Sequence, residues 1–208
     1  MTATARDALT VEYIAGLAPV IPVVVIDDLD DAVPLARALV RGGLPAIEVT
    51  LRTQPALAAI ERIAAEVEGA VVGAGTITTT GQIADALAAG ARFLVSPGAT
   101  PTLLDGLQDS GVPFLPGTAT PSDLVALIER GITHAKLFPA EVVGGVKALK
   151  AFSGPFPQLR FCPTGGINAA NAPDYLALPN VACVGGSWMV SRDLERVENA
   201  AREALGLK

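Results

Sequence analysis

The sequence predicts an α/β protein: a (β/α)8 TIM barrel formed by a single domain over residues 1–208, with an additional N-terminal helix. Eight short apolar runs alternate with segments of helical periodicity, and this pattern indicates right-handed βαβ units and a parallel sheet. The length of 208 residues and the 50% hydrophobic content suit one core, although eight units at this length leave short loops. A doubly wound open sheet is the alternative arrangement.

The expected strands are the apolar runs, which in chain order cover residues 21–26, 45–50, 70–76, 93–98, 113–119, 134–140, 160–166 and 182–187. Five glycines each stand between a helix-like segment and the next run, where a left-handed helix stop is expected: Gly43, Gly69, Gly90, Gly111 and Gly131. Residues 121–131 have a typical helix start, with Thr120 as N-cap, Pro121 in the first helical position and Asp123 in the first turn.

The additional helix is expected in "TVEYIAGLA", where Val11, Ile14 and Leu17 share one face that can cap an end of the barrel. The net charge of −6 and the pI near 4.8 argue against nucleic-acid and anionic-membrane surfaces. The longest apolar run, residues 17–26, is too short to span a bilayer, and the start of the chain resembles no secretory signal. A cytoplasmic protein is therefore expected.

Cysteine and histidine usage favours neither a disulfide framework nor a metal site. Cys162 and Cys183 lie in apolar segments, which fits buried, reduced thiols. His134 is the only histidine, and its place at the start of a strand predicts a structural role, far from the catalytic end of a barrel. "VGAGT" lacks the spacing of a dinucleotide fingerprint. No metal and no cofactor are expected.

Lys136 is the only one of four lysines that falls in an expected strand, since Lys147 and Lys150 belong to a helix with a solvated face. In "PAIEVTLRT", side-chain alternation turns Glu48 into the barrel, on the same face as Arg52. A buried Glu–Lys pair is either a structural ion pair or an amine that attacks a carbonyl beside a carboxylate that moves protons. The residues alone leave both interpretations open.

Other candidates follow the ends of the expected strands, where a barrel of this kind has its active site. Arg52 offers a planar fork for a carboxylate or phosphate, and Thr76 follows glycines that let backbone and ligand approach closely. Pro97, Phe138 and Pro139 are expected to line the pocket near the amine. Phosphate is expected at two loops that lead into helix N-termini, one with Asn168 as a possible N-cap; their residues are Gly165, Gly166, Gly185, Gly186 and Ser187.

The chain resembles the family of 2-keto-3-deoxy-6-phosphogluconate (KDPG) aldolases, which also includes 4-hydroxy-2-oxoglutarate (KHG) aldolases. The motifs that carry the resemblance are "APVIPVVVI", "GLPAIEVTLRT", "VGAGTI", "FLVSPG", "KLFPAE", "RFCPTGGIN" and "VGGSWM". The resemblance implies a homotrimeric class I aldolase of the Entner–Doudoroff pathway, whose partner is a phosphorylated keto acid. The resemblance implies cleavage of KDPG to pyruvate and glyceraldehyde 3-phosphate, with 4-hydroxy-2-oxoglutarate as a second expected substrate.

The resemblance also implies roles for single residues. Lys136 matches the Schiff-base lysine and Glu48 the general acid and base. Thr164 matches a threonine associated with the gluconate-derived substrate. The positions near the substrate carboxylate and pyruvyl group are matched by Arg52, Thr76, Pro97 and Phe138, and those of the phosphate site by Gly165, Gly166, Gly185, Gly186 and Ser187.

Three other functions fit some of the same residues. A phosphate-sugar isomerase or epimerase would use Glu48 as base and Lys136 as an electrostatic clamp, without a covalent adduct. A non-catalytic protein would bind a phosphorylated ligand without turnover. A metal-dependent aldolase is disfavoured by the single histidine.

Overall fold

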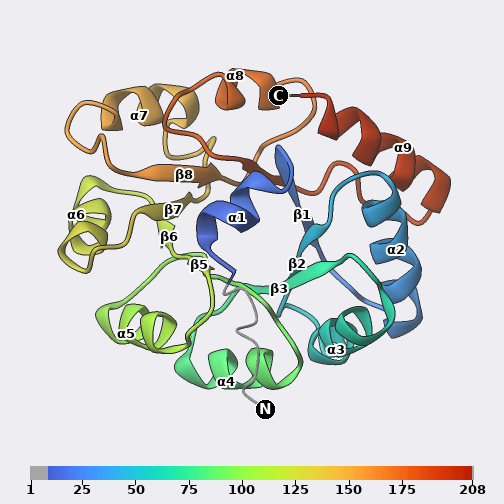
Figure 1. Ribbon diagram of the computed structural model, residues 1–208. Coiled ribbons are helices and arrows are strands. Elements are labelled where there is room, and N and C mark those ends of the chain that lie inside the picture. The colour runs from blue at the N-terminus through green and yellow to red at the C-terminus, as the bar shows by residue number, and fades with distance from the viewer. Residues whose placement is uncertain (1–8, 208) are drawn as a thin grey trace, which may run out of the picture.

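The computed structural model describes residues 9–207 and shows parallel strands that form a barrel inside a ring of helices (Figure 1). The strands are β1 Val20–Val24, β2 Ala46–Thr50, β3 Val71–Gly75, β4 Leu94–Val95, β5 Phe114–Leu115, β6 Gly117–Thr118, β7 His134–Leu137, β8 Arg160–Pro163 and β9 Val184–Gly186. The helices are α1 Val11–Gly16, α2 Leu29–Arg41, α3 Ala56–Glu66, α4 Thr80–Ala88, α5 Pro101–Asp109, α6 Pro121–Glu129, α7 Gly145–Phe152, α8 Ala172–Leu176 and α9 Leu194–Leu205.

The strands close on themselves, so the expectation of a barrel is confirmed and the open sheet is wrong. One sheet has the order β5-β4-β3-β2-β1-β9 and the other the order β6-β7-β8. Parallel bridges join Phe161 to Val181 and Thr164 to Gly185, which links β8 to the β9 segment. The expected strand over residues 113–119 is divided at Pro116 into β5, which pairs with β4, and β6, which pairs with β7. These two pairings connect the sheets on the other side.

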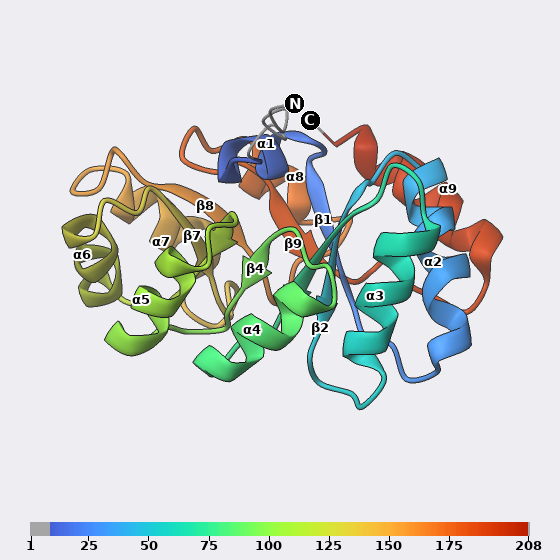
Figure 2. The same cartoon turned by 60° about the horizontal axis from the view of Figure 1, so that its bottom comes forward.

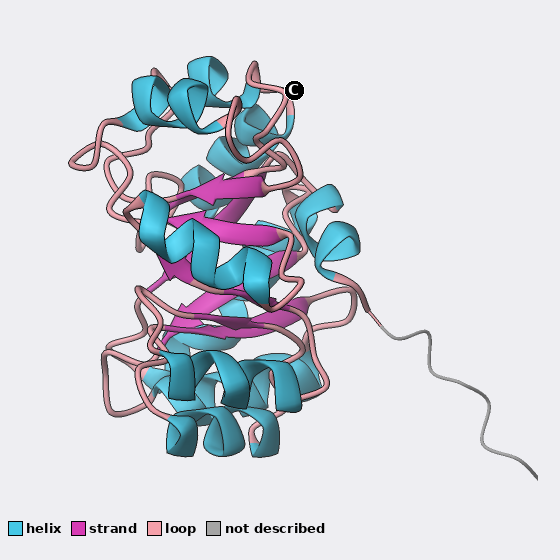
Figure 3. Cartoon of the chain, turned by 90° about the vertical axis from the view of Figure 1, so that its left-hand side faces the viewer, coloured by secondary structure: helices cyan, strands magenta, loops and turns pink. Residues whose placement is uncertain are grey.

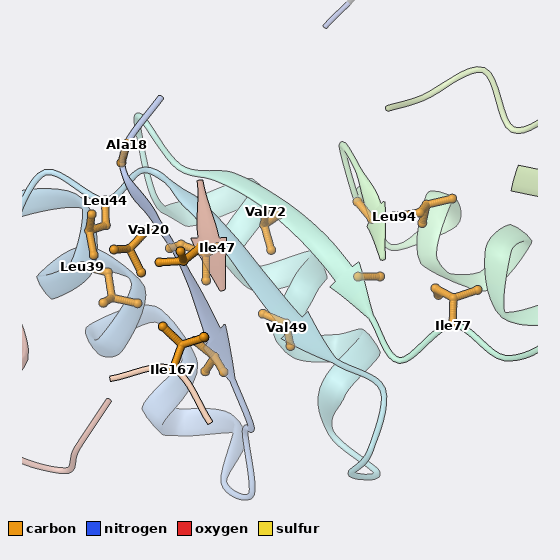
Figure 4. Close-up of a cluster of buried hydrophobic side chains, with 14 of the residues drawn as sticks. Ala18, Val20, Leu39, Leu44, Ile47, Val49, Val72, Ile77, Leu94 and Ile167 are labelled. Carbon is orange, nitrogen blue, oxygen red and sulfur yellow. The ribbon is translucent and has the colours of Figure 1, made fainter. Parts of the chain in front are cut away.

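Two buried clusters follow from the alternation of side chains along the strands. The larger cluster fills the layer between the outer face of the strands and the helices, where Ile47 and Val49 of β2 lie (Figure 4). Figure 3 shows the strands stacked between these helices. The smaller cluster lies inside the barrel, where Ala46 and Phe93 pack with Ile14 of α1.

Helix α1 crosses one end of the barrel, as Figures 1 and 2 show. Its Ile14 and Ala15 are buried, whereas Val11 and Leu17 are half-buried against the same cluster. The prediction of a capping helix is therefore confirmed. Within residues 9–207, none of the helices combines the length and the apolar character needed to cross a membrane.

The expected helix ends are also confirmed. All five glycines that were expected to stop helices have a positive φ, between 70° at Gly131 and 93° at Gly43. The Thr120 hydroxyl accepts the N–H of Asp123, and the Asp123 carboxylate in turn accepts the N–H of Thr120, so α6 begins with a complete capping box. These caps fix where each helix ends and the next strand begins.

Candidate active site

Lys136 and Glu48 meet inside the barrel. Lys136 belongs to β7 and Glu48 to β2, two strands that are not neighbours in the sheets. The Nζ atom of Lys136 lies 3.1 Å from Oε1 and 3.4 Å from Oε2 of Glu48. Both residues are buried, at 5% and 3% exposure. An amine and a carboxylate with almost no water around them interact more strongly than a surface pair, and each is within reach to pass a proton to the other.

Glycines on the neighbouring strands make room for this pair. A Cβ atom on Gly75 of β3 would lie 2.6 Å from Cγ and 2.7 Å from Cδ of Glu48. A Cβ atom on Gly73 would meet the ring of Phe93 at 2.5 Å. The space over these glycines is therefore filled by side chains, whereas the sequence suggested that they admit the ligand itself. Gly75 was not identified from the sequence as a site residue. The only signal for it was a glycine inside an expected strand, adjacent to the strand that carries the inward-pointing Glu48.

Phe138 lies beside the amine, with its ring centroid 5.4 Å from Lys136 Nζ. Pro97 follows β4, and its backbone packs on Gly117, the residue paired with Lys136 in the register of β6 and β7. Thr118 donates its hydroxyl to the Lys136 carbonyl at 3.1 Å. These contacts fix the backbone that carries the lysine.

Arg52 and Thr76 follow two adjacent strands, because Thr50 at the end of β2 is paired with Gly75 at the end of β3. Arg52 is exposed, and its Nε donates to the Thr50 hydroxyl at 3.1 Å. That hydroxyl donates its own hydrogen to the Val24 carbonyl, also at 3.1 Å. The buried Thr50 thus orients the guanidinium, a role that the sequence did not suggest.

Thr76 adopts a left-handed backbone conformation, with φ 62°. Residues with a Cβ atom rarely adopt this conformation, which costs about 1 kcal/mol or more. Strained residues of this kind cluster at functional sites. The conformation therefore agrees with the placement of Thr76 among the site residues.

The two glycine loops lie side by side. Gly165 and Gly166 follow β8 and have φ values of 98° and 81°. Gly185 and Gly186 belong to β9, and Thr164 bridges to Gly185. Ser187 follows them and is exposed. Within residues 9–207, neither the N–H of Gly165 nor that of Gly166 donates to a backbone carbonyl. Both N–H groups are therefore suited to donate to an anion.

The two loops lead into α8 and α9, but the first of these helices does not begin at Asn168. Asn168 is not the N-cap of the following helix, because α8 begins only at Ala172 and spans five residues. Its side chain instead accepts the N–H groups of Ala170 and Asn171 in a turn before the helix. After β9, α9 begins at Leu194. An anion at the glycine loops would therefore contact loop N–H groups, and several residues separate each loop from the helix that follows it.

The remaining candidates lie where the sequence placed them. His134 is at the start of β7, and its Nδ1 lies 3.5 Å from a carboxylate oxygen of Glu12 in α1, at the end of the barrel opposite the lysine head. Lys147 and Lys150 are exposed on α7, and both cysteines are buried. Over residues 9–207, no group of three or more His, Cys, Asp or Glu side chains is arranged to hold a metal ion.

Comparison with known families leads to the same family as the sequence motifs. The pattern of the family described as KDPG and KHG aldolase matches residues 11–204, nearly the whole chain. The chain belongs to this aldolase family.

Relatives in the family are similar over nearly their full length. The KHG/KDPG aldolase of Escherichia coli K12 is 50% identical over 200 residues, which cover 93% of this chain and 94% of that one. The crystal structure of the KDPG aldolase of Zymomonas mobilis ATCC 29191 superposes with a TM-score of 0.94 at 46% identity, covering 96% of this chain and 98% of the other.

A third relative bears on the chemistry. The KDPG aldolase of Legionella pneumophila was crystallised with pyruvate captured at low pH as a covalent carbinolamine intermediate. That structure superposes with a TM-score of 0.93 at 46% identity, covering 95% of this chain and 99% of the other. A carbinolamine forms when an amine adds to a carbonyl, so that relative carries an amine that attacks pyruvate.

Proposed function

We propose that the chain is a class I aldolase that cleaves 2-keto-3-deoxy-6-phosphogluconate reversibly to pyruvate and glyceraldehyde 3-phosphate, with 4-hydroxy-2-oxoglutarate as a second substrate. The observation that carries the proposal is the buried amine of Lys136, 3.1 Å from the Glu48 carboxylate. An imine mechanism needs a nucleophile and a proton shuttle within reach of the same carbon atom. These two side chains provide them.

The reaction begins when the neutral amine of Lys136 attacks the C2 ketone of the substrate and forms a carbinolamine. Glu48 delivers the proton that lets the hydroxyl of C2 leave as water, and a protonated imine remains. Glu48 then removes the proton of the C4 hydroxyl. The C3–C4 bond breaks, its electron pair moves into the iminium, and glyceraldehyde 3-phosphate leaves. Protonation of the enamine at C3 and hydrolysis of the imine release pyruvate and regenerate the amine.

The other candidate residues have supporting roles in this proposal. Arg52, oriented by Thr50, binds the carboxylate of the substrate with its remaining N–H groups, and Thr76 contributes beside it. Phe138 and Pro97 exclude water from the amine. The phosphate is bound by the two segments that hold Gly165, Gly166, Gly185, Gly186 and Ser187. Thr164 contacts the substrate hydroxyls between the carboxylate and the phosphate.

Turnover of KDPG by purified protein tests the proposal, with released pyruvate measured through a coupled lactate dehydrogenase assay. We expect Lys136→Ala to have no measurable activity. Glu48→Gln should lose about 100-fold or more in kcat, as expected when a general acid and base is removed, while the KM changes little. Wild-type activity in either variant would contradict the assigned role. A protein that releases no pyruvate and forms no covalent adduct, but interconverts phosphorylated sugars, would instead support an isomerase-type use of the pair.

We further propose that the protein is a cytoplasmic homotrimer, as other members of the resembled family are expected to be. Light scattering of the purified protein should then give a mass of about 64 kDa, three times the 21.2 kDa of the chain. A mass of one chain would contradict the trimer. Fractionation of the source cells should recover the protein with cytoplasmic markers.

A further inference from the structure

Glu141 and Tyr175 join two loops at the catalytic end of the barrel. Glu141 follows β7, the strand that carries Lys136, and Tyr175 belongs to α8, the helix that follows the first glycine loop. The Tyr175 hydroxyl donates a hydrogen bond to Oε1 of Glu141. Burial and the adjacent carboxylate raise the pKa of Tyr175 well above its ordinary value, so the hydroxyl remains a donor at neutral pH.

The glycine loop rests directly on the stem of Glu141. A Cβ atom on Gly166 would lie 2.5 Å from Cγ and 2.8 Å from Cβ of Glu141. The N–H of Glu141 donates to the Gly165 carbonyl at 3.1 Å, and the N–H of Ala140 donates to the Thr164 carbonyl at 2.8 Å. Glu141 therefore supports both the position and the left-handed conformation of the loop.

Neighbouring residues enclose this contact. Gly145, with φ 53°, lies at the start of α7, and a Cβ atom there would be 2.6 Å from the Tyr175 oxygen and 3.1 Å from Oε1 of Glu141. Asn171 holds the glycine loop from its other end, because its side-chain amide donates to the Gly166 carbonyl at 3.0 Å. Figure 1 shows α7 and α8, the helices on either side of the contact, next to each other in the ring.

We propose that Glu141 and Tyr175 are a positioning pair that holds the Gly165–Gly166 loop in the form that receives phosphate, and thereby sets the preference for a phosphorylated substrate. The inference rests on the proposed function. A carboxylate that turns toward an anion site opposes anion binding, and the repulsion weakens as the distance between the two charges grows. The hydroxyl fixes Oε1 beside Tyr175, so that Glu141 supports the loop without turning its charge toward the phosphate.

The decisive comparison is between a reaction that involves the phosphate and one that does not. In Tyr175→Phe we expect the KM for KDPG and the inhibition constant for inorganic phosphate each to rise about tenfold, the effect of one lost hydrogen bond to a charged group. The rate at which borohydride traps the imine of pyruvate should remain within about twofold of wild type, because pyruvate carries no phosphate. Tyr13→Phe is the matched control, because the Tyr13 side chain is exposed on α1 at the opposite end of the barrel, and it should change neither quantity.

Substitutions of Glu141 keep the test decisive if Tyr175→Phe does not fold, because Glu141 is exposed. Glu141→Gln retains an acceptor for the hydroxyl and removes the charge, so its KM for KDPG should equal the wild-type value or fall below it. Glu141→Ala removes the support and should reproduce the tenfold rise. An unchanged KM in Glu141→Ala, or a parallel loss of pyruvate trapping, would overturn the positioning role. A wild-type protein that neither cleaves KDPG nor traps pyruvate would instead refute the proposed function.

Discussion

Replacement of Gly75 by alanine tests how tightly the barrel interior positions the catalytic carboxylate. The new Cβ atom would lie 2.7 Å from Cδ of Glu48, whereas ordinary van der Waals contact begins at 3.4 Å. The carboxylate therefore has to move by at least about 0.7 Å, the difference between these two distances. Its oxygen would then no longer be placed 3.1 Å from Lys136 Nζ.

A displacement of this size has a predictable cost. Misplacement of a reacting group by about 1 Å lowers rates by about 100-fold, so we expect kcat of Gly75→Ala to fall by about tenfold to 100-fold, or about 1.4 to 2.7 kcal/mol in activation free energy. Overpacking should also lower the free energy of unfolding by about 1 to 3 kcal/mol. The measurements are steady-state cleavage of KDPG and urea denaturation of the same preparation.

Two controls separate the position of the carboxylate from overpacking in general. Gly73→Ala lies on the same face of β3 and would press on the ring of Phe93, so it should lose similar stability but keep kcat. At Gly154 nothing lies within 4 Å of an added Cβ atom, and Gly154→Ala should change neither property. A wild-type kcat in Gly75→Ala, or an equal loss in Gly73→Ala, would refute the reasoning.

Three further substitutions test other parts of the account. Thr50→Val removes the hydroxyl that joins Arg52 to the Val24 carbonyl, so the KM for KDPG should rise about tenfold, with recovery in Thr50→Ser; a KM unchanged in the valine variant would contradict the orienting role. Thr76→Gly relieves the left-handed strain and should raise the free energy of unfolding by up to about 1 kcal/mol while kcat/KM falls; lower stability in urea denaturation would argue against strain. Burial lowers the pKa of His134 below its ordinary 6.5, so the unfolded chain takes up a proton at a higher pH than the folded one, and stability should decrease as the pH falls below about 6.5. The decrease should be smaller in His134→Gln when urea midpoints are compared at neutral and mildly acidic pH, and an identical decrease would contradict this assignment.

Local signals in the sequence were sufficient to predict most of the fold. A glycine that ends a helix can be predicted from the residues at that helix end alone, which is why Gly43 and Gly131 were identified. The same holds for the capping box at Thr120. The alternation of side chains along β2 was enough to predict that Glu48 points into the barrel, and its partner Lys136 was not needed for that prediction. Each of these rules acts within a few residues of the chain.

The features that were not predicted depend on contacts between distant segments. The steric role of Gly75 appears only when β3 is placed beside Glu48, and the bond between Tyr175 and Glu141 joins residues 34 positions apart. The division of residues 113–119 at Pro116 reflects pairing with two different neighbours. Asn168 had the composition of an N-cap, but the chain makes a turn there before α8 begins. Sequence periodicity carries no information about such contacts.

The most direct test of the central claim is to locate the covalent adduct that pyruvate forms. The protein is incubated with pyruvate and borohydride, and the modified peptide is identified by mass spectrometry. A reduced pyruvyl adduct on Lys136 is the expected result, and it should be absent from Lys136→Ala. Absence of any adduct in folded wild-type protein, or an adduct on Lys147 or Lys150 instead, would contradict the assignment of Lys136 as the nucleophile.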